Sequence, residues 1–251
     1  MKYIEIFSEK RVFDFSFVVG ITNSENLARE TLQNYLKKGY IKRVKKNLYV
    51  TMSFETTGVI PSKYEIASNI TKSSYVSHHS AFEYYGYNNQ VYNDVVTASI
   101  ERFYDFTFEY NEYKYKNVSN DKYVDTINGV RVSTLPKTIV DCIDDVKSYD
   151  DMEELIYNLS ALPVINGSQI MEYLLYVNKK ILFNKVGLVL SHFNDGYLVD
   201  DSILNQMKTL GIKGVKYFTN EKHRLNKYYK EWNLYCYNLD KLLVEDEDEK
   251  L

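Results

Sequence analysis

Residues 22–50 constrain the fold more than any other stretch of this chain, because their spacing changes from helical to strand-like over a short distance. In the helical part, the residues expected to be buried recur every three or four positions, which is the spacing of one helix face. They are Leu27, Ala28, Thr31, Leu32, Tyr35 and Leu36. Thr22, with Glu25 three residues later, matches a capping box and predicts the start of this helix. Gly39, which follows two lysines, predicts its end.

Residues 41–50 predict a basic hairpin. The apolar members of its two short strands are Ile41, Val44, Leu48 and Val50. Lys45, Lys46 and Asn47 fall at the turn, and asparagine tolerates the positive φ that such turns need.

Two further helices are predicted upstream of this stretch. Residues 1–9 form the first, and the very apolar residues 13–19 form the second, capped by Asp14 or Ser16 and ended by Gly20. The aromatic and β-branched content of residues 13–19 leaves a strand open as the alternative. Residues 20–23 would then be the turn. The order of helix, turn, helix, glycine and basic hairpin is typical of a winged helix-turn-helix.

The polar flank of the predicted helix and the hairpin hold the candidate DNA ligands. Arginine pairs well with guanine edges and Asn or Gln with adenine edges, whereas cationic side chains neutralise phosphates. The candidates for base edges are Asn23, Asn26, Arg29 and Gln33, and those for phosphates are Lys42, Arg43, Lys45 and Lys46. Ser24, Lys37 and Asn47 complete the expected DNA-binding set.

Charge supports this interpretation. From Arg29 to Lys46 the chain has seven basic residues and one acidic residue, about +6, whereas the whole chain carries −3. A local concentration of positive charge is what contact with a DNA backbone requires. The alternative is a solvated charged helix beside an ordinary surface hairpin, because many helix surfaces are equally charged.

The pattern of the whole chain predicts an α+β fold. The turn-prone residues 53–61 predict a boundary between a domain of residues 1–52 and a second domain of residues 61–244, with an acidic tail at 245–251. The second domain is expected to contain a small antiparallel sheet, with turns near Asn111–Glu112 and a type I′ turn at Asn128–Gly129. Helices are expected at 61–70, 78–85, 134–143, 150–159, 168–177, 181–193 and 201–210, and final strands at 217–218 and 234–237.

Three segments resemble the AbiE-type antitoxins of bacterial phage-defence operons. They are YLKKGYIKRVKKNLYV at 35–50, YVSHHSAFEYYG at 75–86 and TLPKTIVDCID at 134–144. In that family they form the end of a recognition helix with its wing, a helix near the start of the antitoxin domain, and the helix after that domain's sheet. The family usually has glycine in the wing turn, where this chain has Asn47, and often arginine before the threonine of the third segment, where it has Lys137. Both departures fit, because Asn adopts the left-handed conformation and Lys keeps the charge.

The resemblance implies an antitoxin that is also a transcriptional autorepressor. Such a protein would bind inverted repeats in its own promoter through the N-terminal winged helix. It would counter a nucleotidyltransferase-like toxin through the C-terminal domain, without a stable complex. A second interpretation keeps the winged helix only as a fold and lets the acidic second domain capture a basic partner protein. A third, a metal-dependent nuclease, would use the acidic residues between Asp141 and Glu154.

The sequence otherwise offers little catalytic chemistry. It has no P-loop, no dinucleotide-binding glycine motif and no nucleophile elbow. His78 and His79 are adjacent on a predicted helix and therefore point about 100° apart, which does not suit one metal ion. The acidic residues lack the spacing and glycine of an EF-hand. We expect no catalytic activity, metal or cofactor.

The expected location is the cytoplasm. Neither an apolar signal core nor a run of ~20 apolar residues is present, so no membrane association is expected. Cys142 and Cys236 lie in no ligand spacing, which favours a reducing compartment. A second basic run, residues 213–230, interleaves lysines with aromatics, and such a pattern can follow a phosphate backbone or stack on bases. The alternative is an ordinary charged surface whose aromatic residues belong to the core.

Overall fold

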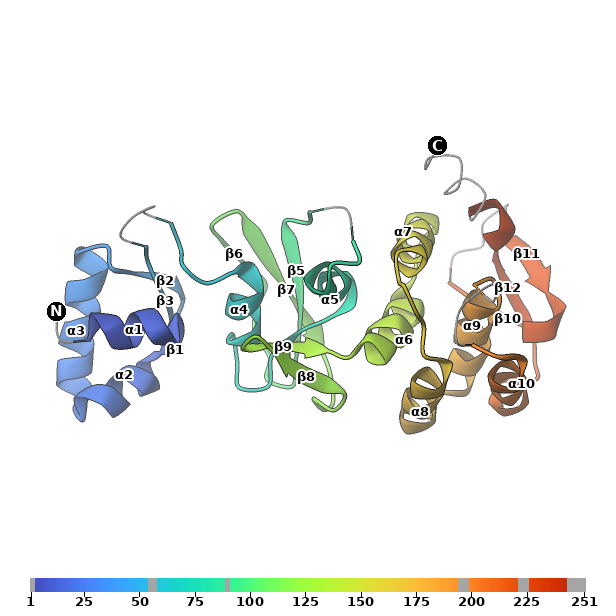
Figure 1. The fold of residues 1–251 in the computed structure, drawn as a ribbon, viewed down its shortest axis with the longest axis horizontal. Helices are drawn as coiled ribbons and strands as arrows, with labels where there is room; N and C mark the ends of the chain where they lie inside the picture. The colour runs from blue at the N-terminus through green and yellow to red at the C-terminus, as the bar shows by residue number, and fades with distance from the viewer. Residues whose placement is uncertain (1–2, 54–57, 89–90, 194–198, 221–225, 243–251) are drawn as a thin grey trace. The chain divides into compact units, whose positions relative to one another are not determined.

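A computed structural model describes residues 3–53, 58–88, 91–193, 199–220 and 226–242 of the chain. The fold is α+β, as expected (Figure 1). The chain divides into two compact units. Unit 1 contains residues 1–80 and 92–132, and unit 2 contains residues 81–91 and 133–251. Residues 53–61, where we expected a domain boundary, lie within unit 1. The acidic tail expected at 245–251 falls outside the described residues.

Unit 1 begins with what we call the N-terminal module, residues 3–52. Its elements are α1 (Ile4–Lys10), β1 (Val12–Asp14), α2 (Phe15–Thr22), α3 (Glu25–Lys37), β2 (Ile41–Lys45) and β3 (Leu48–Thr51). The three strands form an antiparallel sheet in the order β1-β3-β2. The predicted sequence of helices followed by a hairpin is therefore present, with a short additional strand after α1.

The ambiguous apolar residues 13–19 are divided between a strand and a helix. Phe13 pairs with Tyr49 of β3, whereas α2 begins at Phe15. Asp14 separates the two elements, because its Oδ1 accepts a hydrogen bond from the Phe17 N–H at 2.8 Å and so caps α2. The prediction that Gly20 ends the helix was wrong. A glycine inside a helix costs only about 1 kcal/mol, and α2 continues until Asn23 adopts φ 54°.

The start of α3 also differs from the prediction. Ser24 is its N-cap, and the side chain accepts from the Leu27 N–H at 3.4 Å. Thr22 is the last residue of α2, and its hydroxyl donates to the Val18 carbonyl at 2.8 Å. The expected Thr22–Glu25 capping box was therefore wrong, since Thr22 is already used by the preceding helix.

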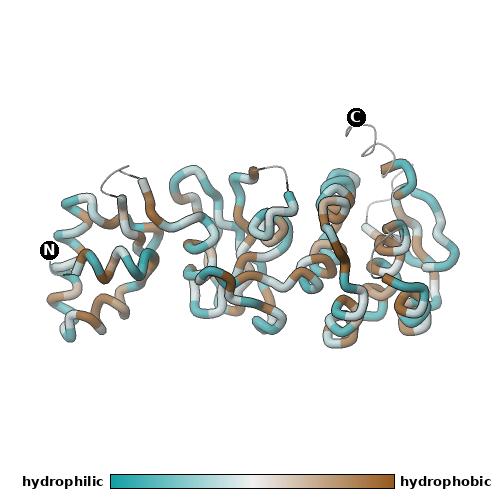
Figure 2. The backbone as a smooth tube through the Cα atoms, in the orientation of Figure 1, coloured by the Kyte–Doolittle hydropathy of each residue, from teal (hydrophilic) through white to brown (hydrophobic). Residues whose placement is uncertain are grey.

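The N-terminal module has its own hydrophobic core. Its buried members are Phe7, Phe13, Val18, Ala28, Leu32, Tyr35, Ile41 and Tyr49. Figure 2 shows α2 as a largely apolar segment, in agreement with its place beside this core. Leu27 was expected on the buried face but is 40% exposed. The rest of the expected α3 face is buried or half-buried, so the helix orientation follows the predicted pattern.

A six-stranded sheet forms the rest of unit 1. Its strands are β4 (Tyr75–Val76), β5 (Asp94–Ser99), β6 (Phe106–Phe108), β7 (Asn111–Asn117), β8 (Val124–Ile127) and β9 (Val130–Ser133), in the order β6-β7-β5-β4-β9-β8. The β4–β5 and β6–β7 pairs are antiparallel, but the β5–β7 and β4–β9 pairs are parallel, so the sheet is mixed and the expected antiparallel arrangement holds only in part. Alternating residues define strands but not the direction of their neighbours, which depends on long-range pairing.

The turns of this sheet were predicted with mixed success. Asn128 and Gly129 have φ values of 49° and 80°, which confirms a turn with two left-handed residues. The β6–β7 turn falls at Glu109–Tyr110 instead of Asn111–Glu112. Two helices follow the module in sequence: α4 (Lys63–Ser68), which begins with a Ser62–Glu65 capping box, and α5 (His78–Tyr85).

Unit 2 contains a group of helices followed by a small sheet. The helices are α6 (Leu135–Asp145), α7 (Tyr149–Ser160), α8 (Gly167–Val177), α9 (Lys180–Ser191) and α10 (Asp201–Leu210). The elements after them are β10 (Lys216–Tyr217), β11 (Asn226–Tyr229), the 3₁₀ helix η1 (Lys230–Trp232) and β12 (Leu234–Tyr237), and the strand order is β10-β12-β11. The expected strand at 234–237 is confirmed, the one at 217–218 begins one residue earlier, and β11 was not predicted.

Close packing joins the small sheet to α9. Gly187 lies so near the Trp232 ring that an added Cβ would be 2.2 Å from it. Asn184 is buried; its amide donates to the Trp232 carbonyl at 2.7 Å, and its Oδ1 accepts from the Ile212 N–H at 2.7 Å. One side chain of α9 therefore holds two segments of the following chain. Among the described residues, no helix combines the length and apolarity that crossing a bilayer requires.

Candidate nucleic-acid interface

The α3 helix presents a continuous polar stripe to solvent. The exposed residues are spaced three or four apart and therefore share one face: Asn26, Arg29, Glu30, Gln33 and Lys37. The opposite face, with Ala28, Leu32 and Tyr35, is buried in the core of the N-terminal module. The structure thus brings together four of the predicted DNA-binding residues on one side of a helix that is anchored by its other side.

Arg29 is held near the start of this stripe by weak local contacts. Its Nη2 lies 3.1 Å from Glu25 Oε2, and its guanidinium lies 5.4 Å from the centre of the Phe15 ring. The two charged side chains are 63% and 67% exposed. An exposed ion pair of this kind contributes little to stability, so the guanidinium can exchange the carboxylate for a guanine edge or a phosphate at small cost.

Asn23 and Ser24 stabilise the turn between α2 and α3. Asn23 adopts the left-handed conformation that ends α2, and Ser24 caps α3. The Asn23 side chain is exposed at the amino end of α3, whereas Ser24 is half-buried. Of these two predicted ligands, Asn23 is therefore the better placed to contact DNA.

The β2–β3 hairpin carries three exposed cations, Lys42, Arg43 and Lys46. Arg43 Nε donates to the Lys45 carbonyl at 3.3 Å, which leaves the rest of the guanidinium beside the turn. Asn47 has φ 68°, as expected for the turn residue. Its Oδ1 also accepts from the Phe15 N–H at 3.3 Å, so the Asn47 side chain links the turn to the start of α2.

Lys42 and Lys45 are oriented differently from the other predicted phosphate ligands. Lys42 Nζ lies 2.5 Å from Glu109 Oε1, at the tip of the β6–β7 hairpin. Lys45 Nζ lies over the rings of Phe103 and Phe106, 4.9 and 5.2 Å from their centres. Burial lowers the pKa of Lys45. Both lysines therefore hold the β2–β3 hairpin against residues of the same unit. Sequence analysis missed these contacts because the partners are about 60 residues away in the chain.

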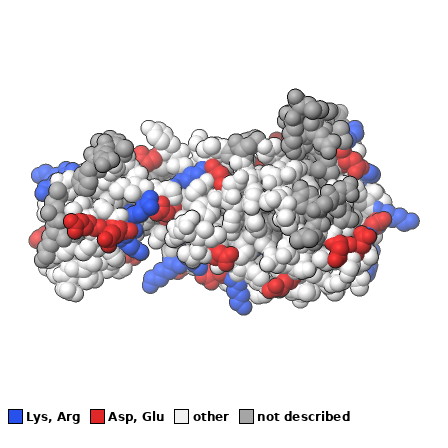
Figure 3. All heavy atoms as spheres, viewed as in Figure 1, with Lys and Arg blue, Asp and Glu red and all other residues white. Residues whose placement is uncertain are grey.

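A second contact joins the N-terminal module to the rest of unit 1. Arg11 Nη2 lies 3.1 Å from Glu65 Oε2 and donates to the Ile60 carbonyl at 2.8 Å. Acidic and basic side chains are interspersed on the face drawn in Figure 3. Contact with nucleic acid would therefore depend on α3 and its hairpin and not on a uniformly basic surface.

The histidine pair and the acidic residues have structural partners. His78 is buried, with Nδ1 3.0 Å from Ser77 Oγ, and His79 Nε2 lies 3.4 Å from Asp94 Oδ2. The hydrogen bond from His79 lowers the pKa of Asp94. Asp144 Oδ1 lies 2.8 Å from Lys179 Nζ. Among the described residues, no group of three or more His, Cys, Asp or Glu side chains is arranged to hold a metal ion.

Lys137, one of the departures from the family pattern, lies in the interior of unit 2. Its Nζ lies 2.8 Å from Asp141 Oδ2 and donates to the Tyr173 hydroxyl at 2.8 Å. That hydroxyl donates in turn to Asp141 Oδ1 at 2.9 Å. The three side chains form a closed polar network between α6 and α8, which explains why a cation is accommodated in this buried position.

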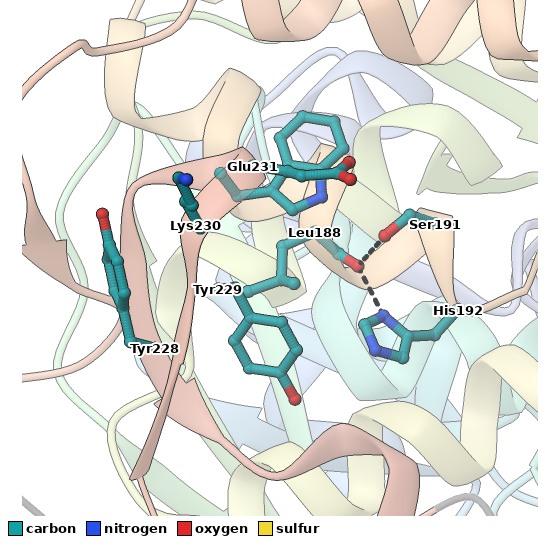
Figure 4. A pocket seen from close by; sticks show the side chains of 8 residues that line it. Leu188, Ser191, His192, Tyr228, Tyr229, Lys230 and Glu231 are labelled. Atoms are coloured by element: carbon teal, nitrogen blue, oxygen red, sulfur yellow. Dashed lines mark hydrogen bonds between the residues drawn. The ribbon is translucent and has the colours of Figure 1, made fainter.

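Unit 2 also contains a pocket of about 370 Å³ between α9 and the β11–η1 segment (Figure 4). Its lining includes Ser191, His192 and Tyr229. The Ser191 hydroxyl donates to the Leu188 carbonyl at 2.7 Å, and His192 Nδ1 lies 2.9 Å from the same oxygen. Both side chains are therefore directed at the backbone of α9 and do not form a nucleophile–base pair.

The fold as a whole is similar to that of a known structure. The sequence matches no protein-family model and none of the curated proteins. Among solved structures, the chain is similar to the Rv2827c protein of Mycobacterium tuberculosis, with a TM-score of 0.61 at 10% sequence identity. The similarity covers 94% of this chain and 89% of that one. At this identity the likeness concerns the fold alone.

Proposed function

We propose that this chain is a cytoplasmic DNA-binding autorepressor that acts through an N-terminal winged helix-turn-helix and also serves as an antitoxin. In this proposal α3 is the recognition helix and the β2–β3 hairpin is the wing. The helix would enter the major groove of inverted repeats in the chain's own promoter. The rest of the chain would counter a nucleotidyltransferase-like toxin without a stable complex.

The polar stripe of α3 is the observation that carries this proposal. A helix that is anchored on one face and exposes Asn26, Arg29 and Gln33 on the other has the side chains that read adenine and guanine edges. Lys37 extends the stripe with a cation, and Arg43 and Lys46 place two more on the hairpin. The order of elements in the N-terminal module and the three segments that resemble AbiE-type antitoxins support the same function.

The contacts of the hairpin lysines refine the assignment of roles. Because Lys42 and Lys45 are held by Glu109 and the Phe103–Phe106 rings, we assign the phosphate contacts to Arg43, Lys46 and Lys37. Lys42 and Lys45 then fix the orientation of the wing. Asn47 supplies the left-handed conformation of the hairpin turn, and Ser24 caps the recognition helix.

A salt-titrated binding assay tests the proposal. The full chain is titrated into a fluorescent duplex of its own upstream region and into a scrambled duplex, between about 50 and 200 mM salt. We expect preferential binding to the upstream duplex. The double variant Arg43→Ala/Lys46→Ala should weaken binding to both duplexes alike and reduce the slope of log K against log salt by about 1 per lost phosphate contact.

A lysine on unit 2 provides the matched control. Lys147 has a 78% exposed side chain, and Lys147→Ala should leave the affinity and the salt slope unchanged. Absence of duplex binding by the parent chain, or identical binding by the parent and the hairpin variant, contradicts the proposed DNA contact.

The alternative function is direct capture of a basic partner protein. It is favoured by the pairing of Lys42 with Glu109 and the packing of Lys45 over the Phe103 ring, which leave fewer hairpin cations available to DNA. Co-purification with the product of the neighbouring gene separates the two functions. A salt-stable complex together with no promoter binding would support capture. Promoter binding, with rescue of growth in cells that express the toxin and no isolable complex, would support the proposed antitoxin.

A further inference from the structure

The small sheet of unit 2 carries a ladder of three tyrosines, one on each strand. Tyr217 of β10 and Tyr228 of β11 are both direct register partners of Tyr235 on the central strand β12. The ring centres of Tyr217 and Tyr235 are 5.1 Å apart with 22° between the planes, and those of Tyr228 and Tyr235 are 4.9 Å apart at 35°. The three rings therefore form one continuous aromatic row across the sheet.

This row lies on the more exposed side of the sheet. Tyr217 and Tyr228 are 40% and 39% exposed, whereas the flanking β12 residues Leu234 and Cys236 are buried. Side chains alternate along a strand, so Tyr235 projects away from the side on which Leu234 and Cys236 are packed. Figure 4 shows the same alternation in β11, where Tyr228 and Tyr229 leave the strand in opposite directions and Tyr229 extends toward His192.

Contacts on the α9 side of the sheet fix the position of the row. Asn184 and Gly187 of α9 hold Trp232, which lies two residues before Leu234. On the α9 side, the Tyr229 hydroxyl donates to the Tyr237 carbonyl at 3.2 Å and accepts from the Leu239 N–H at 2.9 Å. A row of rings on such an anchored sheet loses little conformational freedom when a flat ligand stacks against it.

Few cations accompany the row in the described residues. Of the six basic residues in residues 213–230, Lys222 and Arg224 fall outside the described residues, and Lys227 is paired with Asp240. Lys216 is exposed, but its register partner is the buried Leu234, so its side chain leaves β10 on the side opposite to the row. Lys230, also exposed, follows Tyr228 by two positions at the start of η1.

We propose that the row of Tyr217, Tyr235 and Tyr228 is a binding site for single-stranded nucleic acid, with bases stacked on the tyrosines and a phosphate near Lys230. Aromatic stacking accepts any base, because every base has a π face, and an adjacent lysine adds attraction for the backbone. The site lies in unit 2 and does not depend on duplex binding by the N-terminal module. A duplex keeps its bases stacked on one another, so it offers few of them to the tyrosines.

Fluorescence anisotropy on the full chain tests this site with labelled 20-mers of oligouridylate and oligodeoxythymidylate. We expect Tyr217→Ala/Tyr228→Ala to weaken binding about tenfold or more, since each stacked base contributes substantially. Tyr217→Phe/Tyr228→Phe keeps both rings and should retain most of the affinity. Tyr104→Ala/Tyr110→Ala is the matched control, because these side chains of unit 1 are 82% and 88% exposed. Binding of only one of the two oligomers also supports the site.

The other outcomes overturn the proposal. One is absence of binding to both oligomers by the parent chain. Another is an equal loss of affinity in the alanine and phenylalanine variants. The last is equal affinity of the parent and the alanine variant. If Arg43→Ala/Lys46→Ala lowers the affinity for the oligomers and the tyrosine variant does not, the binding site is the N-terminal hairpin. Should the alanine variant fail to fold, photocrosslinking of 4-thiouridine oligomers to the parent chain decides the question. Crosslinks at residues 216–217 or 226–235 support the site, and crosslinks only elsewhere contradict it.

Discussion

Lys42 Nζ and Glu109 Oε1 lie 2.5 Å apart, although the two residues are 67 positions apart in the chain. This contact joins the β2–β3 hairpin to the tip of the β6–β7 hairpin. Beside it, Lys45 covers the rings of Phe103 and Phe106. Of the four hairpin cations, Lys42 is therefore paired with a carboxylate and Lys45 is half-buried within unit 1, so the charge left for the proposed DNA contact depends on this junction.

We predict that Glu109→Gln increases DNA binding. Without the carboxylate, Lys42 becomes available to a phosphate, and the salt slope should steepen by about 0.9. The pair is partly exposed, so its loss should cost less than about 1 kcal/mol of stability. Glu112→Gln is the control, because Glu112 pairs with Lys114 on the same hairpin and not with the module. An unchanged slope in Glu109→Gln would show that Lys42 makes no phosphate contact even when unpaired.

Arg29 should determine sequence preference, in contrast to the hairpin cations. A guanidinium that donates two hydrogen bonds to guanine discriminates by about 1–3 kcal/mol against the wrong base. Arg29→Lys keeps the charge but loses the planar fork, so we expect it to relax specificity and to preserve the salt slope. Selection of binding sites from a random duplex pool measures the change. If Arg29→Lys selects the same sites as the parent, Arg29 does not contact bases.

Asn47 should tolerate glycine but not a β-branched residue. Its φ of 68° is accessible to Gly and Asn, whereas Val is strained in that region. Asn47→Gly loses the Oδ1 contact to Phe15, so we expect at most a modest loss of stability. Asn47→Val should cost at least about 1 kcal/mol more, measured by urea unfolding. Equal stability of the two variants would mean that the hairpin turn does not require the left-handed conformation.

Asn184 should be important for the stability of unit 2. Asn184→Ala leaves the Trp232 carbonyl and the Ile212 N–H without their partner, which costs about 1–3 kcal/mol for each buried group left unsatisfied. The exposed Asn205 on α10 serves as control, and Asn205→Ala should change stability by less than about 0.5 kcal/mol. Urea unfolding monitored by the single Trp232 reports on both variants. Equal midpoints for the two variants would contradict this role.

The two cysteines should differ in reactivity. Burial raises the pKa of Cys236 to about 12, whereas the half-buried Cys142 is closer to solvent. At pH 8 we expect a thiol reagent to label Cys142 first and Cys236 only on unfolding. The pKa of Cys236 in the folded protein lies above its unfolded value near 9. The contribution of the neutral thiol to the free energy of unfolding is therefore fully present below pH 9 and is lost as the pH rises from 9 to 12. Rapid labelling of both thiols in the native protein would contradict the burial of Cys236.

Local patterns in the sequence predicted α3 and its hairpin, but not the short strand β1 or the end of α2. The spacing of Leu32 and Tyr35 identified the buried face of α3, and the basic residues with Asn47 identified the hairpin turn. The errors arose at junctions where two local signals compete. Thr22 and Ser24 can both cap the start of a helix. Because α2 extends to Thr22, Ser24 caps α3. Similarly, alternation identified β5 and β7 but not their parallel pairing.

The sequence by itself determined which residues can face water and which can be buried, because helical and strand periods follow from backbone geometry alone. It therefore determined the polar flank of α3 and the basic character of its hairpin. The tertiary structure decided which of those cations have a partner within the protein, as the pairing of Lys42 with Glu109 demonstrates. It also decided that Tyr217, Tyr228 and Tyr235 form one row. Contacts between segments distant in the chain depend on strand pairing and packing, and no local period encodes them.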